Sequence, residues 1–290
     1  MPERKIVVIG AGGPLGLETV RLLSKADATI IAAYRTEWPG LIDKLRSFGA
    51  QPVPLDLRDK ANVDSLLNEA THVVFAPILT AAKNILHALP ENAKSIFFSS
   101  YNVDVDMEAP VYASLRKAEA DLLAAVPDAI ILRPTMVYGH GRDRNLSRLM
   151  SAMRRWPFVV MPGNGKARQQ PLFYRDLAAI VAQTLLGTQI TNGIHTVAGP
   201  VPVTQREVFE AAKRASGKRT LIVPAPLTPV IWAVKGVQRL GRSVPMTPAQ
   251  LSRANQDKVS SQPASLLGST PLGEGLVHLA KALDAEQPGT

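Results

Sequence analysis

The stretch 7-VVIGAGGPLG-16 decides the fold of this chain. Three β-branched residues lead directly into a turn with four glycines and one proline. Gly10, Gly13 and Gly16 are three residues apart, and Pro14 suits the first position of a helix, where the N–H group that it lacks would have no partner. A strand, a glycine turn and a helix in this order are typical of a phosphate-binding turn. We therefore expect the turn to hold a nucleotide, with a purely structural turn as the alternative.

Each of the three spaced glycines has its own physical reason. Gly10 permits the tight turn, Gly13 lets the backbone approach a pyrophosphate, and Gly16 lets the helix lie close to the sheet. Free N–H groups and the positive end of the helix dipole would then face the phosphates. The residues expected to line the turn are Gly10, Gly12, Gly13, Pro14, Leu15 and Gly16.

Short apolar runs alternate with helix-length segments over the first half of the chain. The runs expected to be strands are 6–9, 29–34, the region of Val53, 72–75, 96–98 and 129–132. Strands that alternate with helices form a parallel sheet with helices on both faces. We therefore predict an α/β fold with a doubly wound, parallel Rossmann sheet.

This rhythm breaks at Gly139, where loop-rich sequence begins. Later, "YRDLAAIVAQTLL" reads as a helix and "GIHTVAG" as a strand, so the chain returns to the sheet. We predict a dinucleotide-binding Rossmann domain over 1–138, completed by 172–197. Residues 139–171 and 198–290 are expected to form a smaller, mostly helical C-terminal substrate lobe, in which Thr204 and Glu207 form a capping box.

The composition is that of a globular protein. Of the 290 residues, 46% are hydrophobic and 20% charged, and no apolar run is long enough to cross a bilayer. The N-terminus passes directly into a strand pattern without a signal peptide, so we expect a cytoplasmic location. The lack of cysteine excludes disulfides and thiolate catalysis, and the five histidines are scattered, so no metal is expected.

The net charge of +9 is unevenly distributed. Residues 142–258 hold 18 Lys and Arg against 5 Asp and Glu, which gives +13 there and −4 elsewhere, so this half attracts anions. Its arginines lack interleaved aromatic residues, which disfavours specific nucleic-acid binding. An apolar helical stripe favours core packing over a membrane-surface or protein-partner contact through the basic C-terminal lobe. The stripe consists of Val230, Ile231, Val234 and Val237.

Arg35 follows the second expected strand, in "AAYRTE". An acidic residue at this place would hold the 2′-hydroxyl of the adenosine ribose, whereas a cation suits a 2′-phosphate. The sequence therefore favours NADP(H) over NAD. A solvated charge at the end of a strand is the alternative interpretation of Arg35.

With its GxxGxxG spacing, the chain resembles the short-chain dehydrogenase/reductase superfamily, in its atypical and extended, NAD-dependent epimerase/dehydratase-like branches. The resemblance spans residues 5–280 and is strongest in the glycine turn, in 132-LRPTMVYG-139 and in 195-HTVAGP-200. It is close to the subgroup that includes the nucleotide-binding accessory subunit of respiratory complex I.

The resemblance implies further cofactor contacts. Asp56 would accept a hydrogen bond from the adenine amino group, and Leu57 would line the ring. Ala76 and Pro77 would run along the cofactor ribose, and Arg133 would shape the nicotinamide end. The other cofactor-binding residues that the resemblance implies are Ser99, Tyr112, Pro134, Thr135 and Val137.

The catalytic pattern of this superfamily is altered here. Its members use a Tyr, a Lys four residues later, and a Ser or Thr at the end of the fifth strand. Tyr101 occupies the Ser/Thr position, with Ser100 beside it. Tyr112 is followed at the fourth place by Arg116, and Lys117 comes one residue later.

Two alignments of this helix stay open. Residues i and i+4 lie about 40° apart around a helix and i and i+5 about 140°, so Tyr112 shares a face with Arg116. Alignment on "KAEA" instead puts Lys117 in the family position. An arginine stays protonated and cannot relay a proton. The candidate catalytic residues are Tyr112, Arg116, Lys117 and Ser100, with ordinary helix-surface roles for Tyr112 and Arg116 as the alternative.

Two functions follow as hypotheses. The first is an NADP(H)-dependent oxidoreductase or epimerase-like enzyme acting on a small, anionic carbonyl or sugar-type substrate. The substrate would lie near His140, Arg142, Arg144 and Arg168. The second is a non-catalytic NADP(H)-binding scaffold or redox sensor. The sequence does not identify the substrate or the oligomeric state.

Overall fold

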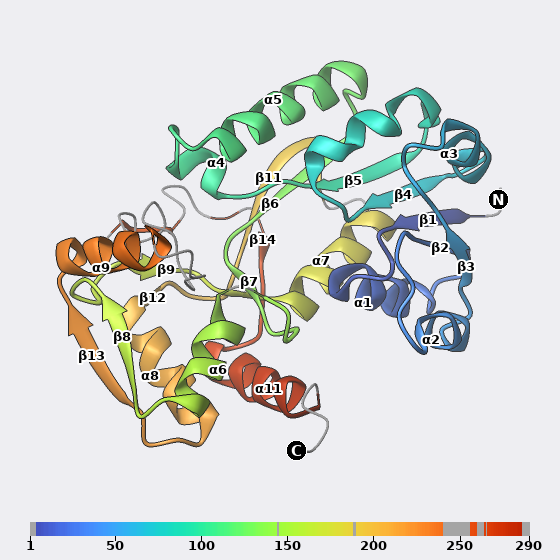
Figure 1. Cartoon of the computed structure of the whole chain (residues 1–290). Coiled ribbons are helices and arrows are strands. Elements are labelled where there is room, and N and C mark those ends of the chain that lie inside the picture. Colours follow the sequence, from blue (N-terminus) through green and yellow to red (C-terminus); the bar gives the residue numbers. More distant parts are fainter. Residues whose placement is uncertain are drawn as a thin grey trace. The chain divides into compact units, whose positions relative to one another are not determined.

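The computed structural model describes residues 4–143, 145–187, 190–239, 256–259, 264 and 266–285 (Figure 1). The chain divides into two compact units. The first contains Met1–Pro134, Tyr174–Val197 and Pro263–Gly268, and the second contains Thr135–Phe173, Ala198–Gln262 and Ser269–Thr290.

The first unit is built on an eight-stranded sheet in the order β3-β2-β1-β4-β5-β6-β11-β14. Neighbouring strands from β3 to β11 are all parallel. The order 3-2-1-4-5-6 is that of the Rossmann fold, so the predicted fold class is confirmed. The strands are β1 (Lys5–Ile9), β2 (Thr29–Tyr34), β3 (Gln51–Pro54), β4 (His72–Phe75), β5 (Lys94–Phe98), β6 (Ile130–Pro134), β11 (Gly193–Ala198) and β14 (Leu266–Leu267).

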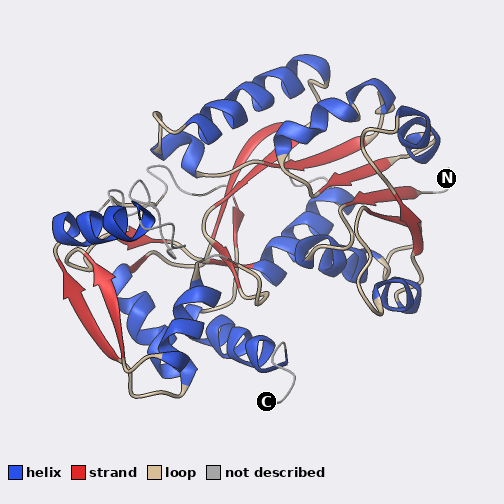
Figure 2. Cartoon of the chain, in the orientation of Figure 1, coloured by secondary structure: helices blue, strands red, loops and turns tan. Residues whose placement is uncertain are grey.

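Helices cover both faces of this sheet (Figure 2). α1 packs against α7 on one face, and α5 packs against η1 on the other. A buried cluster fills the second face, where Phe75 and Phe97 from the strands meet Leu115 and Leu122 from α5. The central strands are apolar throughout because both faces are covered. The helices are α1 (Pro14–Leu23), α2 (Leu41–Ser47), α3 (Lys60–Leu67), η1 (Leu79–Asn84), η2 (Leu86–Ala88), α4 (Asn102–Val105), α5 (Pro110–Ala125) and α7 (Tyr174–Leu186).

In its described residues, the second unit combines helices with three two-stranded sheets, β7·β10, β9·β12 and β8·β13. α8 packs against α6 and α11, and it begins with the predicted capping box: Thr204 N–H donates to Glu207 Oε2 at 2.6 Å, and Glu207 N–H donates to Thr204 Oγ1 at 3.2 Å. The elements are β7 (Val137–Tyr138), α6 (Leu146–Arg155), β8 (Phe158–Pro162), β9 (Arg168–Gln169), β10 (Leu172–Phe173), β12 (Val203–Thr204), α8 (Gln205–Ser216), β13 (Leu221–Ala225), α9 (Leu227–Arg239) and α11 (Leu272–Ala285).

The apolar stripe of the sequence lies on α9. Ile231, Val234 and Val237 are partly buried there, while the Val230 side chain lies outside the described residues. In the part of the chain that the structure describes, no helix has the length and apolar character needed to span a bilayer.

Candidate functional site

The glycine turn joins β1 to α1 at the carboxyl edge of the sheet. Gly10 has a φ of +88°, a conformation that favours glycine, and its N–H donates to Ala33 O of β2 at 2.9 Å. A Cβ on Gly16 would lie 2.3 Å from Gly10 O, so the contact between helix and turn requires glycine. Trp38 Nε1 donates to Gly12 O at 3.0 Å and fixes the outer part of the turn, a contact that the sequence patterns did not predict.

Gly13 differs from these glycines because the protein itself does not require it. Its φ of −85° and ψ of 160° suit any residue, and an added Cβ would meet only Gly10 O, at an ordinary 3.5 Å. Leu17 N–H donates to Gly13 O at 2.8 Å as the first bond of the helix. The N–H groups of Leu15 and Gly16 precede that bond and therefore have no intrahelical acceptor. A helix start with free N–H groups is suited to an anion.

The ends of β2 and β3 bring two arginines close to one carboxylate. Arg58 donates from Nε and from a terminal nitrogen to the Asp56 carboxylate, at 3.1 and 2.6 Å. These bonds lower the pKa of Asp56 to about 2, with a smaller electrostatic contribution from the exposed Arg35. Leu57 packs against the core. Arg58 was not among the predicted site residues. Its position two residues after Asp56, which was among them, was a signal that it could belong to the same site.

The residues after β4 and β5 complete this edge of the first unit. Pro77 Cδ and Ala76 Cβ lie 3.2 and 3.3 Å from the position of a Cβ added to Gly10, so both border the glycine turn. Ser99 N–H donates to Leu132 O at 2.8 Å, whereas the buried Ser99 Oγ has no hydrogen-bond partner among the described residues. A buried hydroxyl without a partner is uncommon and fits a polar group supplied from outside the chain.

Asn102 connects two of the predicted catalytic residues. Its Nδ2 donates to Tyr112 Oη at 3.0 Å, and its backbone N–H donates to Ser100 Oγ at 3.3 Å. Tyr101 is buried, and its N–H donates to Pro134 O at 3.1 Å. The polar group next to Tyr112 is therefore an asparagine amide, which the sequence patterns did not single out.

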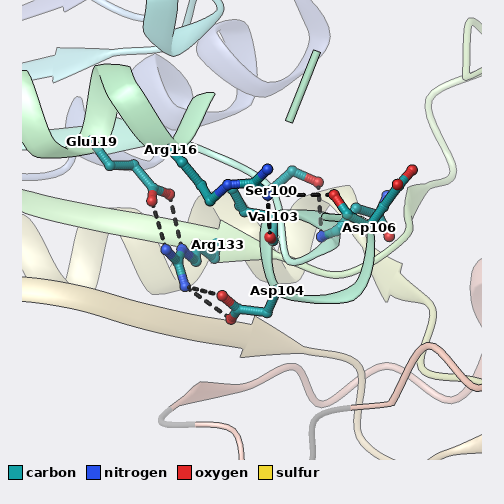
Figure 3. Close-up of polar contacts among 8 residues, drawn as sticks. Ser100, Val103, Asp104, Asp106, Arg116, Glu119 and Arg133 are labelled. Carbon is teal, nitrogen blue, oxygen red and sulfur yellow. Dashed lines mark hydrogen bonds and ion pairs between the residues drawn. The ribbon is translucent and has the colours of Figure 1, made fainter. Parts of the chain in front are cut away.

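Arg116 and Lys117 form their bonds elsewhere. Lys117 Nζ pairs with Asp121 at 2.7 Å on the exposed side of α5, with side-chain exposures of 76% and 57%. The Arg116 guanidinium holds the segment after β5 by donating to three carbonyl oxygens. Two are those of Val103 (2.7 Å, Figure 3) and Asp106 (3.3 Å), and the third is that of Met107 (2.9 Å). The structure thus joins Ser100 and Tyr112 through Asn102, and it places Lys117 in a surface ion pair.

Arg133 of β6 forms a second set of polar contacts with this segment and with α5. Its guanidinium donates to both Glu119 oxygens, at 2.8 and 2.6 Å, and to both Asp104 oxygens at 2.8 Å (Figure 3). The Glu119 side chain is only 4% exposed, and its hydrogen bond raises the pKa of Arg133. Arg133 therefore links β6, α5 and α4.

The remaining implied cofactor residues lie in the second unit. Thr135 Oγ1 donates to Gln170 O, and Val137 of β7 pairs with Leu172 of β10. Both residues fix the start of this unit to the segment 170–172.

The residues expected near a substrate also have partners within the second unit. Arg142 N–H donates to His140 Nδ1 at 3.2 Å, and Arg168 Nε pairs with Asp257 at 3.0 Å. Arg144 lies outside the described residues.

Comparisons with known proteins agree with this architecture. The chain matches the model of the NmrA-like family over residues 2–230. It is 24% identical over 239 residues to the mitochondrial NADH-ubiquinone oxidoreductase 40 kDa subunit of Neurospora crassa, covering 76% of this chain and 62% of that protein, and thus less than two thirds of that relative's length. It is 25% identical over 240 residues to an NAD(P)H azoreductase of Xenophilus azovorans, covering 80% and 81%.

Solved structures share the fold. The triphenylmethane reductase of Citrobacter sp., in a structure complexed with NADP(H), superposes with a TM-score of 0.75 at 17% identity, covering 95% of this chain and 99% of that one.

Proposed function

The chain belongs to the NmrA-like family, and from this premise we propose that it is an oxidoreductase that binds NADP(H) at the carboxyl edge of its Rossmann sheet. The observation that carries the proposal is Gly13, which the fold does not require and which precedes two helix N–H groups without intrahelical acceptors. A diphosphate that approaches the backbone gives a reason for both. The unpartnered Ser99 Oγ supports a ligand at the same edge.

Arg35 and Arg58 support a preference for the 2′-phosphorylated cofactor. Both lie beside Asp56, at the ends of the two strands where the adenosine half binds in a Rossmann fold. A phosphate there would gain charge-assisted hydrogen bonds from guanidinium groups, whereas a bare ribose would leave Arg35 solvated. NADP(H) is therefore favoured over NAD(H).

The arrangement around Tyr112 supports a reaction that needs little proton transfer from the protein. Asn102 orients the Tyr112 hydroxyl, while Arg116 and Lys117 are committed to backbone carbonyls and to Asp121. When bound, NADPH supplies a hydride. We infer that the acceptor is a small conjugated carbonyl compound such as a quinone, because its reduced form is stable as an anion and takes its proton from water. Two similar proteins are named as reductases, which also favours reduction over epimerisation.

A second candidate function is a non-catalytic NADP(H) sensor or scaffold. The departures from the Tyr-Lys pattern support it, since a binding protein needs no proton relay. The match to a respiratory complex subunit is also compatible with this role.

Calorimetry with NADPH and NADH tests the binding proposal. We expect Gly13→Ala to keep the fold and to weaken NADPH binding about 10-fold or more, because the new Cβ would occupy the approach path of the diphosphate. Arg35→Ala should weaken NADPH binding about 10-fold and leave NADH binding unchanged. Failure of both nucleotides to bind the wild-type protein would refute the proposal.

Turnover with quinones, aldehydes and nucleotide sugars then separates the two candidates. A reductase of conjugated acceptors should oxidise NADPH with quinones, and Tyr112→Phe should lose less than about 10-fold of that rate. A reaction that depends on tyrosine as general acid would lose about 100-fold or more. Tight binding of NADPH without turnover on any acceptor would favour the sensor.

A further inference from the structure

The small sheet of the second unit exposes an apolar face. β8 and β13 are parallel, and Leu221 lies beside Phe158 in their register. Phe158, Val160 and Leu221 are 53%, 42% and 62% exposed. Val159 and Met161 alternate with the first two and point the other way, where they are buried. One face of the sheet therefore belongs to the core of the unit, and the opposite face is open and apolar.

The open face continues beyond the strands. Trp156 has the extended backbone angles φ −118° and ψ 144°. Because side chains alternate along extended backbone, Trp156 lies on the same face as Phe158, two residues later. Its side chain is 56% exposed. Val223 pairs with Val160 and is partly exposed. We call Trp156, Phe158, Val160, Leu221 and Val223 the β8–β13 patch. A contiguous exposed apolar patch of this kind marks an interaction surface.

Cations border one end of the β8–β13 patch. Leu221 N–H donates to Pro157 O at 2.8 Å, which joins the turns that precede the two strands, and Figure 1 shows the strands starting side by side. Arg155 lies over the Trp156 ring at 5.7 Å from its centroid. The exposed residues Lys218 and Arg219 belong to the second turn.

These three cations lack a counter-charge among the described residues. Within the described residues, no carboxylate forms an ion pair with Arg155, Lys218 or Arg219. Ion pairs with the described residues therefore do not neutralise their positive charge, and all three belong to residues 142–258, which carry +13.

We propose that the β8–β13 patch docks the protein on an anionic membrane surface. Tryptophan and phenylalanine partition into the interface of a bilayer, where the indole ring keeps its polar edge near water. Lys and Arg beside them are attracted by anionic headgroups. A second copy of this chain is a poorer occupant, because a symmetric contact through the patch would bring the two sets of cations together. This inference does not depend on the proposed function.

Sedimentation with lipid vesicles tests the proposal. We expect the full chain to bind phosphatidylcholine vesicles that contain phosphatidylserine, to bind pure phosphatidylcholine much more weakly, and to dissociate as salt rises. Replacing Arg155, Lys218 and Arg219 together by Gln should weaken binding about 100-fold, at about 1 kcal/mol for each cation. Trp156→Ser with Phe158→Ser should weaken it about 10-fold.

Matched variants control for general charge and hydrophobicity. Lys25, Lys44 and Arg46 are exposed residues of the first unit, and replacing all three by Gln removes the same charge. Val201→Ser with Val277→Ser removes exposed apolar groups outside the patch. Both controls should bind vesicles like the wild type, and unchanged melting temperatures will show that every variant is folded.

Four results would overturn the proposal. The first is no binding to anionic vesicles, and the second is equal losses in the patch and control variants. The third is vesicle binding unaffected by Trp156→Ser with Phe158→Ser, which would indicate charge attraction without insertion. Concentration-dependent dimerisation lost in that same double variant would assign the face to a second copy instead.

Discussion

The glycine turn and the segment from Ser99 to Lys117 belong to the same unit, yet they depart from the family pattern to different degrees. The turn depends on close packing of backbone atoms, and its helix start leaves the N–H groups of Leu15 and Gly16 without intrahelical acceptors, as the proposed diphosphate site requires. The second segment would work through side-chain identity. There, the fourth residue after Tyr112 is Arg116, which binds three carbonyl oxygens, and Lys117 one residue later pairs with Asp121. The positions that depend on backbone geometry therefore keep the pattern of the superfamily, whereas the positions that depend on side-chain identity differ from it.

The largest effect that would test this comparison is expected from Gly16→Val. The Cβ would lie 2.3 Å from Gly10 O and 2.8 Å from Gly10 C, and backbone atoms cannot move aside as a flexible side chain can. We expect a loss of about 4 kcal/mol or more in the free energy of unfolding, which denaturant titration will measure. Gly13→Ala is the matched control and should melt like the wild type. If Gly16→Val were equally stable, close packing would not be what fixes the turn.

A smaller loss of unfolding free energy is expected from Glu119→Gln. This variant tests what stabilises the segment from Ser99 to Lys117. This change removes the charge that faces Arg133 in a largely buried ion pair. We expect about 3 kcal/mol of destabilisation, because the guanidinium would lose its buried counter-charge and one acceptor oxygen and would keep only the more exposed Asp104 as an ionic partner. Asp121→Asn on the exposed side of the same helix should change the unfolding free energy by less than about 0.5 kcal/mol. Equal effects of the two variants would mean that the Arg133 connection does not stabilise the segment.

The smallest effect is expected from Lys117→Ala. Its ion pair with Asp121 is exposed, and such pairs contribute about 0.5 kcal/mol or less. Stability, NADPH binding and any measured turnover should all stay close to wild type. A loss of turnover of about 100-fold would show that Lys117 serves as the catalytic lysine and would remove the contrast between the two regions.

The local patterns of the sequence predicted much of the fold. The strands 29–34 and 72–75 have the predicted bounds, because apolar runs buried on both faces leave little choice of structure. The capping box at Thr204 and the helix start at Pro14 were also predictable, since each depends on residues close in sequence. Helical spacing alone placed Tyr112 and Arg116 on one face.

The contacts of the candidate site were harder to predict because they depend on the path of a loop. Asn102 reaches Tyr112 only because the segment after β5 turns back toward α5, and no spacing rule reports that turn. The carbonyl contacts of Arg116 have the same origin. Trp38 lies 26 residues from the carbonyl that it binds, at Gly12. Contacts of this kind become visible only when the tertiary fold is known.

The three carbonyl contacts of Arg116 also limit how the segment can change by single mutations. A guanidinium is a planar fork with five N–H donors, whereas an ammonium is a single point of charge on a different stem. Arg116→Lys would introduce an ammonium group but would lose some of the three carbonyl contacts. It would therefore release part of the loop that positions Asn102. A lysine in this place would therefore serve Tyr112 only together with a second change that anchors the loop and keeps Asn102 in position.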